Sequence, residues 1–317
     1  MKKIIIVLLF CLITLSISGC SSTNDTKYVV GICQLAKHDA LDSATQGFKD
    51  ALTAEFGDSV VFIEGNAAGD IPTCTTICNG FVADDVDLIL ANATGALQAA
   101  YGATKEIPIL ATSITEYGVA LNIDDFSGIT HTNVSGTSDL APLSEQANMF
   151  KELLPEVTKV AILYCSAEPN SLYQVKVISD ELSKLGIETT PYSFSDSNDV
   201  YLVASKAAEE NQAIYIPTDN TAASCADIIG SVCLDKKIPA ICGEEGSAKK
   251  CGIATLTIDY YELGVLTGKM AISILKGEQD IKDMPIQYFQ NPVKKYNKEI
   301  CEKLNITVPQ DYIAMEN

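Results

Sequence analysis

Few residues of this sequence have the types and spacing that catalysis needs. The chain has two histidines, His38 and His131, and no G-x-S-x-G, H-E-x-x-H or local Cys–His signature, so nucleophilic and zinc-dependent hydrolysis are poorly supported. Asp124–Asp125 and Glu244–Glu245 could form acid pairs, but adjacent side chains usually point apart, so we interpret them as solvated turn acids. Without a G-x-x-x-x-G-K-[ST] motif, the chain itself is not expected to hydrolyse ATP.

The cysteines give no metal or redox signature. Eleven occur, of which Cys11 and Cys20 belong to the N-terminal segment, and no C-x-x-C pair is present. Cys33 and Cys165 each end an apolar strand, so we predict that they are buried thiols. We predict no redox role for the other seven, and we expect no metal and no cofactor. Pairing stays open for one group of four: Cys225, Cys233, Cys242 and Cys251.

The composition is typical of a soluble, acidic binding protein. The 317 residues are 47% hydrophobic and 20% charged, which argues against both a disordered chain and a many-pass membrane protein. Lys and Arg total 22 against 41 Asp and Glu, the formal net charge is −19, and arginine is absent. Such a chain lacks the basic patches that nucleic-acid binding requires. It also lacks the guanidinium fork that best clamps a carboxylate or phosphate.

The N-terminal segment has the pattern of an export signal. Two lysines precede an apolar run over 4–17, which is too short to span a bilayer of about 30 Å comfortably. The run ends in Ile17-Ser18-Gly19-Cys20, which resembles a bacterial lipobox. We therefore expect a signal peptide over 1–19, lipidation of Cys20 with chains such as palmitate, and a flexible tether over 20–27. The mature chain would be lipid-anchored to the outer face of the bacterial cell membrane. An uncleaved signal anchor and an ordinary secretory signal are the alternatives.

In the rest of the sequence, patterns typical of strands alternate with patterns typical of helices. Apolar runs bounded by polar loops predict strands, and apolar residues at three- and four-residue spacing predict helices. The predicted strands are 29–33, 60–63, 87–91, 107–110, 159–165, 213–216 and 237–241, and the predicted helices are 40–56, 71–81, 94–101 and 172–185. This β-α-β-α order implies a parallel sheet with helices on both faces.

The same order occurs twice along the chain. Lys237–Ile241 matches Glu106–Leu110, and the strand that begins at Lys159 matches the strand that begins at Val29. We therefore predict an α/β protein with two similar lobes joined by a hinge, each a parallel sheet with helices on both faces. The predicted lobes are 28–133 plus 255–282 for the first, and 134–254 plus 283–317 for the second.

Two such lobes would place a binding cleft between them. Ligands of open parallel sheets bind beyond the carboxyl ends of the strands, so the loops of both lobes should face one cleft. Helix N-termini in such a cleft offer unpaired N–H groups that suit a carboxylate. Chain crossings between the lobes would form the hinge that closes the cleft over a ligand.

Seven segments of the chain match segments of a known protein family, and they occur in the same order along the chain. They are Val30–Asp42, Ala93–Gln98, Ile107–Thr115, Gly136–Asp139, Ser166–Ser171, Pro217–Thr221 and Asp259–Gly264. The chain resembles the substrate-binding lipoproteins of ABC transporters, of the tryptophan/tyrosine-binding type, over nearly its whole mature length. The resemblance implies the type I periplasmic-binding-protein fold.

The resemblance also implies a binding protein rather than an enzyme. In that role the chain, expected as a monomer, would bind a small amino acid in the cleft, with tryptophan, tyrosine or phenylalanine as the first expectation. It would deliver this ligand to a membrane permease driven by a cytoplasmic ATPase. The alternatives are a protein that binds another small polar metabolite, a ligand-loaded sensor that docks on a membrane receptor, and an exported enzyme on the same frame.

An amino-acid ligand needs separate partners for its carboxylate and its ammonium group. Without arginine, the carboxylate must be met by hydroxyls, amides and helix N-termini, and the matching residues are Thr94, Ser166, Asn170 and Ser171. Their competing role is simple N-capping. Asp219 follows an apolar strand and is the first choice for the ammonium group, with a structural cap as its alternative.

The remaining candidates come from neighbouring loops and from the matching segments. They are Gln34, His38, Ser113, Thr115, Ser138, Asn220, Glu244 and Asp259. An aromatic ligand would also need flat apolar walls, and the tyrosines nearest to these loops in sequence are Tyr101, Tyr117, Tyr164 and Tyr173. His131 lies near the first expected crossing, where a role in the hinge stays open.

Overall fold

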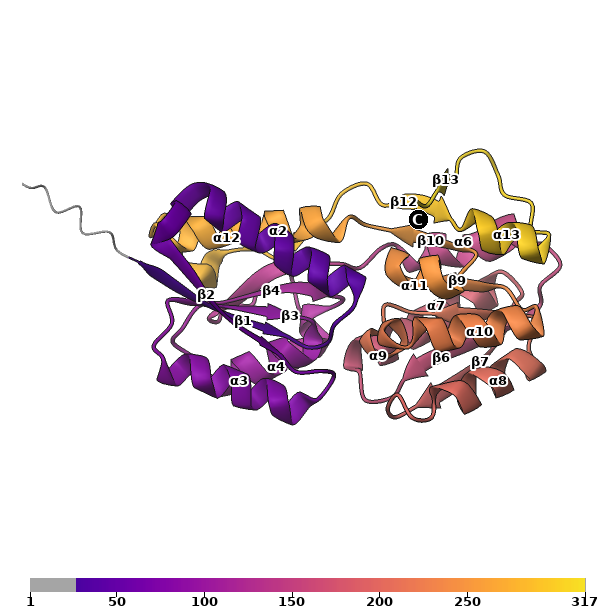
Figure 1. Cartoon of the computed structure of the whole chain (residues 1–317), viewed down its shortest axis with the longest axis horizontal. Helices are drawn as coiled ribbons and strands as arrows, with labels where there is room; N and C mark the ends of the chain where they lie inside the picture. Colours follow the sequence, from indigo (N-terminus) through magenta and orange to yellow (C-terminus); the bar gives the residue numbers. More distant parts are fainter. Residues whose placement is uncertain (1–26, 317) are drawn as a thin grey trace, which may run out of the picture.

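A computed structural model describes residues 27–316 and places them in two α/β lobes, one beside the other (Figure 1). The predicted signal peptide, the lipidated Cys20 and almost all of the predicted tether lie outside the described residues. Among the helices of residues 27–316, none has the length and apolar character needed to cross a membrane.

The first lobe contains a six-stranded sheet in the order β11-β5-β4-β3-β1-β2. Its strands are β1 (Tyr28–Gln34), β2 (Val60–Asn66), β3 (Leu88–Asn92), β4 (Ile109–Ile114), β5 (Val134–Ser138) and β11 (Gln287–Tyr288). Its helices are α2 (Asp39–Phe56), α3 (Ile71–Ala83), α4 (Thr94–Ala103), α5 (Tyr117–Leu121) and α12 (Tyr260–Leu275), with 3₁₀ turns η1 (Gly57–Ser59) and η2 (Ile281–Asp283). All pairings in this sheet are parallel.

The second lobe contains a seven-stranded sheet in the order β13-β12-β10-β9-β8-β6-β7. Its strands are β6 (Lys159–Cys165), β7 (Glu188–Phe194), β8 (Ala213–Ile216), β9 (Ala240–Cys242), β10 (Ala254–Thr257), β12 (Val293–Tyr296) and β13 (Ile313–Ala314). Its helices are α6 (Leu143–Leu153), α7 (Pro169–Lys184), α8 (Val200–Glu210), α9 (Asn220–Ser224), α10 (Ala226–Lys236), α11 (Glu245–Cys251) and α13 (Lys298–Leu304). One pairing, of β10 with β12, is antiparallel, so this sheet is mixed rather than wholly parallel as predicted.

The two sheets confirm the duplicated α/β fold. The central order β4-β3-β1-β2 of the first sheet corresponds to β9-β8-β6-β7 of the second, strand for strand. The predicted match of Lys237–Ile241 with Glu106–Leu110 therefore joins equivalent strands, β9 and β4. β9 begins only at Ala240, later than predicted, because Lys237 is the left-handed C-cap of α10.

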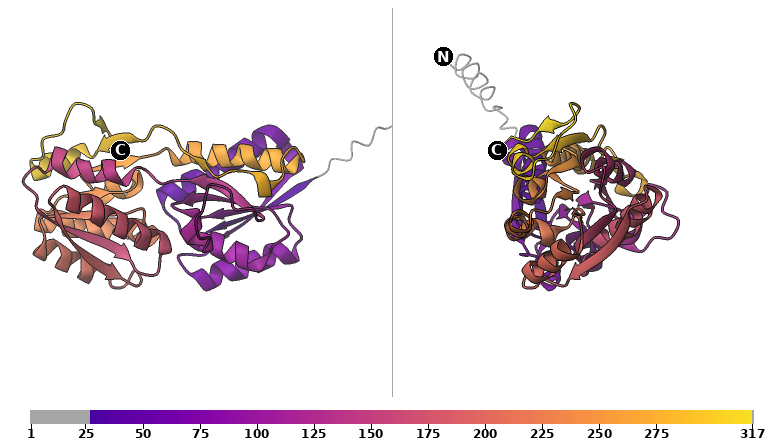
Figure 2. Two further views of the ribbon diagram at one scale, coloured as in Figure 1. Left: turned by 180° about the vertical axis from the view of Figure 1, so that it is seen from behind. Right: turned by 90° about the vertical axis from the view of Figure 1, so that its right-hand side faces the viewer.

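The chain crosses between the lobes after β5, after β10 and after β11. These crossings differ from the predicted boundaries, because β5 and β11 pair within the first sheet and β10 pairs within the second. A strand beside a crossing can extend either sheet, and its apolar pattern does not say which. Figures 1 and 2 show the crossing segments near one another, on the side of the molecule that carries α12 and β12.

Close helix packing covers one face of the first sheet. Helices α2 and α12 lie on that face, while α3 and α4 cover the other (Figure 1). Gly47 of α2 faces the backbone of α12, and a Cβ added to it would lie 2.1 Å from the carbonyl oxygen of Tyr261. Gly264 of α12 faces the backbone of α2, and a Cβ added to it would lie 2.0 Å from the carbonyl oxygen of Ala44. Since α2 and α12 both begin at the cleft, this contact fixes two walls of the cleft relative to one another.

The cysteines are buried, as predicted for Cys33 and Cys165. The nine cysteines of the described residues are all free and buried. Cys242 and Cys251 come closest to pairing, with their sulfur atoms 3.7 Å apart. Burial raises the pKa of several of these thiols, so they are held in the unreactive protonated form.

Candidate functional site

A narrow cavity lies between the lobes, where the carboxyl ends of the central strands meet. The first lobe lines it from the start of α2 and the end of β4, and the second lobe from the loops after β6, β8 and β9. Its lining residues are His38, Ala40, Leu41, Ser113, Thr115, Asp139, Asn170, Thr218, Asp219, Asn220, Ala223, Glu244 and Tyr260. Polar side chains dominate this wall, and no lysine is among them.

A bulge at the end of β4 aims Ser113 at this cavity. The register of β4 against β5 shifts between Ala111 and Ile114, and Ser113 adopts a left-handed backbone with φ of 57°. Such a conformation is costly for a residue other than glycine and is concentrated at functional sites. The Ser113 hydroxyl is buried and has no hydrogen-bond partner among the described residues. It is therefore free to bond to a molecule in the cavity.

Asp139 and Tyr260 contribute from the crossing segments. Asp139 directly follows β5 and is 6% exposed, while Tyr260 begins α12 after the second crossing. The Tyr260 hydroxyl donates to Asp139 Oδ2 at 2.9 Å, and the Thr115 hydroxyl donates to Asp139 Oδ1 at 3.4 Å. Burial raises the pKa of Asp139 to about 6, although these two hydrogen bonds oppose the shift.

Asp219 caps helix α9 from inside the second lobe. Its Oδ1 accepts from the Ala222 N–H at 2.7 Å, and its Oδ2 accepts from the Cys165 N–H at 2.6 Å and from the Ser171 hydroxyl at 2.7 Å. Burial, with the neighbouring charge of Glu168, raises the pKa of Asp219 to about 7. The structural cap, which competed with ligand binding in the sequence interpretation, is thus present at this residue.

Glu168 organises the second-lobe side of the cavity. Its carboxylate accepts hydrogen bonds from the N–H and side chain of Asn220 and from the N–H and hydroxyl of Thr221, at 2.7–3.0 Å. It also accepts from Asn170 Nδ2 at 3.2 Å. Glu168 itself does not line the cavity, but it orients two side chains that do, Asn170 and Asn220.

Two side-chain contacts join the lobes directly across the cleft. His38 Nε2 of the first lobe lies 3.2 Å from Asn220 Oδ1 of the second. Gln174 Nε2, on α7, also lies 3.5 Å from the Thr115 hydroxyl. These contacts hold the lobes together in this structure.

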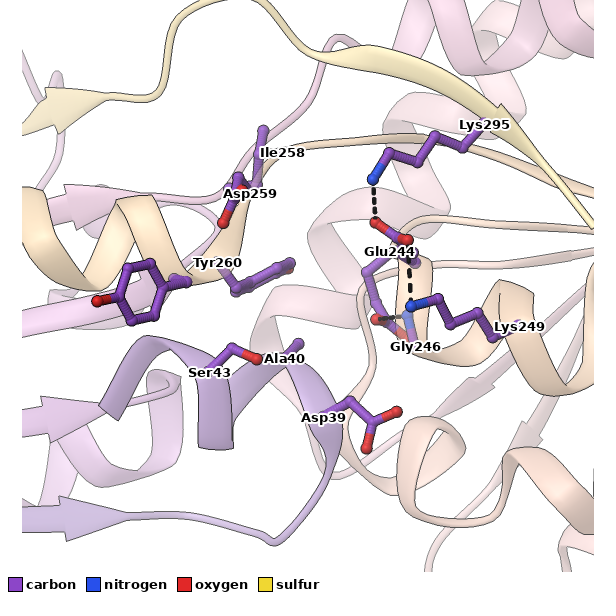
Figure 3. Close-up of a pocket in the computed structure, with 12 residues that line it drawn as sticks. Asp39, Ala40, Ser43, Glu244, Gly246, Lys249, Ile258, Asp259, Tyr260 and Lys295 are labelled. Carbon is purple, nitrogen blue, oxygen red and sulfur yellow. Dashed lines mark hydrogen bonds and ion pairs between the residues drawn. The ribbon is translucent and has the colours of Figure 1, made fainter. Parts of the chain in front are cut away.

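A second pocket adjoins the cavity, and Figure 3 shows it in close-up. The two share Ala40, Glu244 and Tyr260 in their walls. This pocket carries the cations that the cavity lacks, but both are engaged: Glu245 pairs with Lys295 at 2.6 Å and with Lys249 at 3.3 Å. The negative charge of the cavity is therefore not offset from this side.

The structure separates the sequence-predicted residues into two groups. The residues that line the cavity are His38, Ser113, Thr115, Asn170, Asp219, Asn220 and Glu244. The residues that do not are Gln34, Thr94, Ser138, Ser166, Ser171 and Asp259. Most of the second group bond to their own lobe instead: Ser166 donates to Phe194 O, and Asp259 caps α12.

Other parts of the sequence interpretation are corrected. Glu244 is not a solvated turn acid, because it is 2% exposed and accepts from the Gly246 and Ser247 N–H groups. None of the tyrosines suggested as aromatic walls lines the cavity: Tyr101, Tyr117, Tyr164 and Tyr173. Its one aromatic ring is that of Tyr260. His131 is exposed in the loop before β5, away from the crossing at Asp139.

Known proteins share both the sequence and the fold. A family model described as ABC transporter substrate binding protein matches residues 29–316. The chain belongs to this family. The substrate-binding protein is 34% identical over 301 residues to the tyrosine-binding protein of Clostridioides difficile (strain R20291), covering 91% of this chain and 86% of the relative. The family comprises solute-binding proteins rather than enzymes, and they work outside the cytoplasm with a membrane permease.

Solved structures confirm the type I periplasmic-binding-protein-like fold. An ABC domain from Streptococcus pneumonia in complex with L-Trp has a TM-score of 0.85 at 31% identity, covering 90% of this chain and 96% of that one. The ligand-free, open structure of a substrate-binding protein with adhesive properties from Clostridium difficile has a TM-score of 0.69 at 33% identity, covering 92% and 99%. At nearly equal identity, the substrate-binding protein described here resembles the ligand-bound structure more than the open one.

Proposed function

We propose that this substrate-binding protein encloses one aromatic L-amino acid in the cavity between its lobes and delivers it to the permease of an ABC importer. The observation that carries the proposal is the cavity itself. Residues of both lobes line it, and it lies at the carboxyl ends of the central strands, where open parallel sheets bind their ligands. Its wall combines carboxylates for an ammonium group with the unpartnered Ser113 hydroxyl for a carboxylate.

The apolar part of the wall supports an aromatic side chain. Tyr260 offers a ring, and Leu41, Ala40 and Ala223 add apolar surface from both lobes. Relatives that cover most of the chain are described as a tyrosine-binding protein and as a complex with L-Trp, which favours the same class of ligand. We further propose that the protein acts as a monomer held to the outer face of the membrane through lipid on Cys20, as the lipobox-like sequence indicates.

Calorimetry on the purified mature protein tests the ligand class. We expect L-tryptophan, L-tyrosine or L-phenylalanine to bind at a one-to-one ratio, and small polar amino acids to bind at least tenfold more weakly. Because the chain contains no tryptophan, indole fluorescence during a titration with L-tryptophan would come from the ligand alone. Absence of heat with all three aromatic amino acids would contradict the proposal.

The affinity for such a ligand should depend on pH. Burial raises the pKa of Asp139 to about 6 and that of Asp219 to about 7, both above the ordinary value of 3.8. In the folded, ligand-free protein these groups hold protons that the unfolded chain releases, so their contribution to stability is full below about pH 4 and is lost as pH rises through 6 to 7. A ligand ammonium group needs the ionised carboxylate, so the affinity of the protein for the ligand rises as pH rises through this range.

We therefore expect L-tyrosine to bind about tenfold more weakly at pH 5 than at pH 7.5, since one proton must leave a group with a pKa near 6. The rise in melting temperature that a fixed excess of ligand causes should be smaller at pH 5. Calorimetry at both pH values measures the first effect and differential scanning fluorimetry the second. Equal affinities at the two pH values would show that no carboxylate titrates on binding.

A further inference from the structure

Three carboxylates line the cavity, and they differ in how their charge is balanced. Asp219 accepts two main-chain N–H groups and one hydroxyl at 2.6–2.7 Å. Glu244 accepts two main-chain N–H groups at 2.5 Å, at the beginning of α11. Helix-terminal N–H groups carry partial positive charge, so both acids are stabilised by their own lobe.

Asp139 lacks this compensation. Its partners on other residues are two neutral hydroxyls, one of them at the long distance of 3.4 Å. None of the ion pairs of the described residues includes it. Glu244 adds a repulsive charge nearby. A buried carboxylate with no cation is costly, and a cation in the cavity would remove that cost.

We propose that Asp139, rather than Asp219, is the carboxylate that pairs with the ammonium group of the ligand. The assignment rests on the proposed function, because it takes the ligand to be an amino acid. It makes Asp139 the residue that selects for an ammonium group and requires it to be ionised. Asp219 then keeps the loops after β6 and β8 in place without contacting that group.

The position of Asp139 links this contact to the hinge. Asp139 is the first residue after β5, where the chain leaves the first sheet, and its N–H still donates to Ile114 O of β4. Tyr260, which holds its carboxylate, is the third residue after β10, where the chain has crossed back. An ammonium group on Asp139 would therefore bind next to two of the crossings.

The variant Asp139→Asn tests the assignment. Asparagine keeps the size of the side chain and an oxygen that can accept from Tyr260, but it removes the charge. The ligands are L-tyrosine and 3-(4-hydroxyphenyl)propanoate, which is the same molecule without its amino group. We expect the variant to lose at least 100-fold in affinity for L-tyrosine and to change its affinity for the des-amino compound by less than threefold.

Two further variants complete the comparison. Asp219→Asn should lower the affinity for L-tyrosine by less than tenfold. Asp280→Asn replaces a helix-capping carboxylate at η2, outside the cavity, and should leave the affinity unchanged. Melting temperatures show that each variant is folded. The assignment is overturned if Asp139→Asn keeps its affinity for L-tyrosine within threefold, or if it loses both ligands equally.

The outcome for the wild-type protein separates the two proposals. If the wild type binds a non-aromatic amino acid instead, the same comparison with that amino acid and its des-amino analogue decides the role of Asp139, while the aromatic ligand class is rejected. If the wild type binds only compounds without an ammonium group, both proposals fail.

Discussion

Replacing Gly264 by alanine is expected to lower the free energy of unfolding by about 3 kcal/mol. Helices α2 and α12 meet backbone to backbone at this residue, and the new Cβ would lie 2.0 Å from the carbonyl oxygen of Ala44. The helices would have to separate, because a carbonyl oxygen of a helix cannot move aside as a flexible side chain can. The chemical-denaturation midpoint measures the effect.

The same change should weaken ligand binding. Separation of α2 and α12 moves His38 and Tyr260, which stand at the starts of these helices and line the cavity. Gly102→Ala is the matched control, because Gly102 lies in helix α4 and nothing is within 4 Å of its added Cβ. That substitution should stabilise the protein by about 0.5–1 kcal/mol. Equal effects of both substitutions would contradict the packing argument.

Replacing Glu168 by alanine is expected to destabilise the protein by about 2–3 kcal/mol and to weaken ligand binding at least tenfold. The buried carboxylate holds Asn220 and Thr221, and its removal leaves the main-chain and side-chain donors of both residues without an acceptor. Asn220 would also lose its fixed orientation towards His38, which weakens the contact between the lobes. Thermal unfolding and calorimetry with L-tyrosine measure the two effects.

Glu181→Ala is the control for this prediction. Glu181 also belongs to the second lobe, but its partner Lys184 is an exposed residue one turn away on the same helix. Exposed pairs of this kind contribute about 0–1 kcal/mol. We expect no change in ligand affinity from Glu181→Ala. A loss of affinity as large as that of Glu168→Ala would show that the carboxylate at 168 has no special role.

Strands β1 to β4, β6, β8 and β9 could be predicted from the sequence because each contains a short apolar run between polar loops. The remaining central strand, β7, was not predicted, because its sequence ETTPYSF has no such run. The prediction for β6 and β8 agrees with the structure at both ends. The strands beside the crossings could not be assigned, because β5, β10 and β11 have patterns that fit either sheet. Helices α5 and α9, of five residues each, are too short for a helical period to be visible.

The location of the site could be predicted from the sequence better than the individual residues that line it. The loops after strands β1, β6 and β8 were identified because parallel sheets place these ends together, whereas the loop after β3, predicted on the same ground, contributes no lining residue. At the crossings, however, the prediction named Ser138 and Asp259, whereas their neighbours Asp139 and Tyr260 line the cavity. Adjacent residues of an extended chain point to opposite sides, so an error of one position selects the wrong side chain. The bulge that turns Ser113 inwards has no signal in the apolar pattern.

The reactivity of the buried cysteines can be used to follow the unfolding of each lobe. Cys33, Cys74 and Cys78 lie in the first lobe, and the other six free thiols of the described residues lie in the second. An alkylating reagent such as iodoacetamide reacts with exposed thiolates, so the native protein should resist it. Mass spectrometry would then distinguish a molecule in which one lobe has melted from a molecule in which both have, without any introduced label.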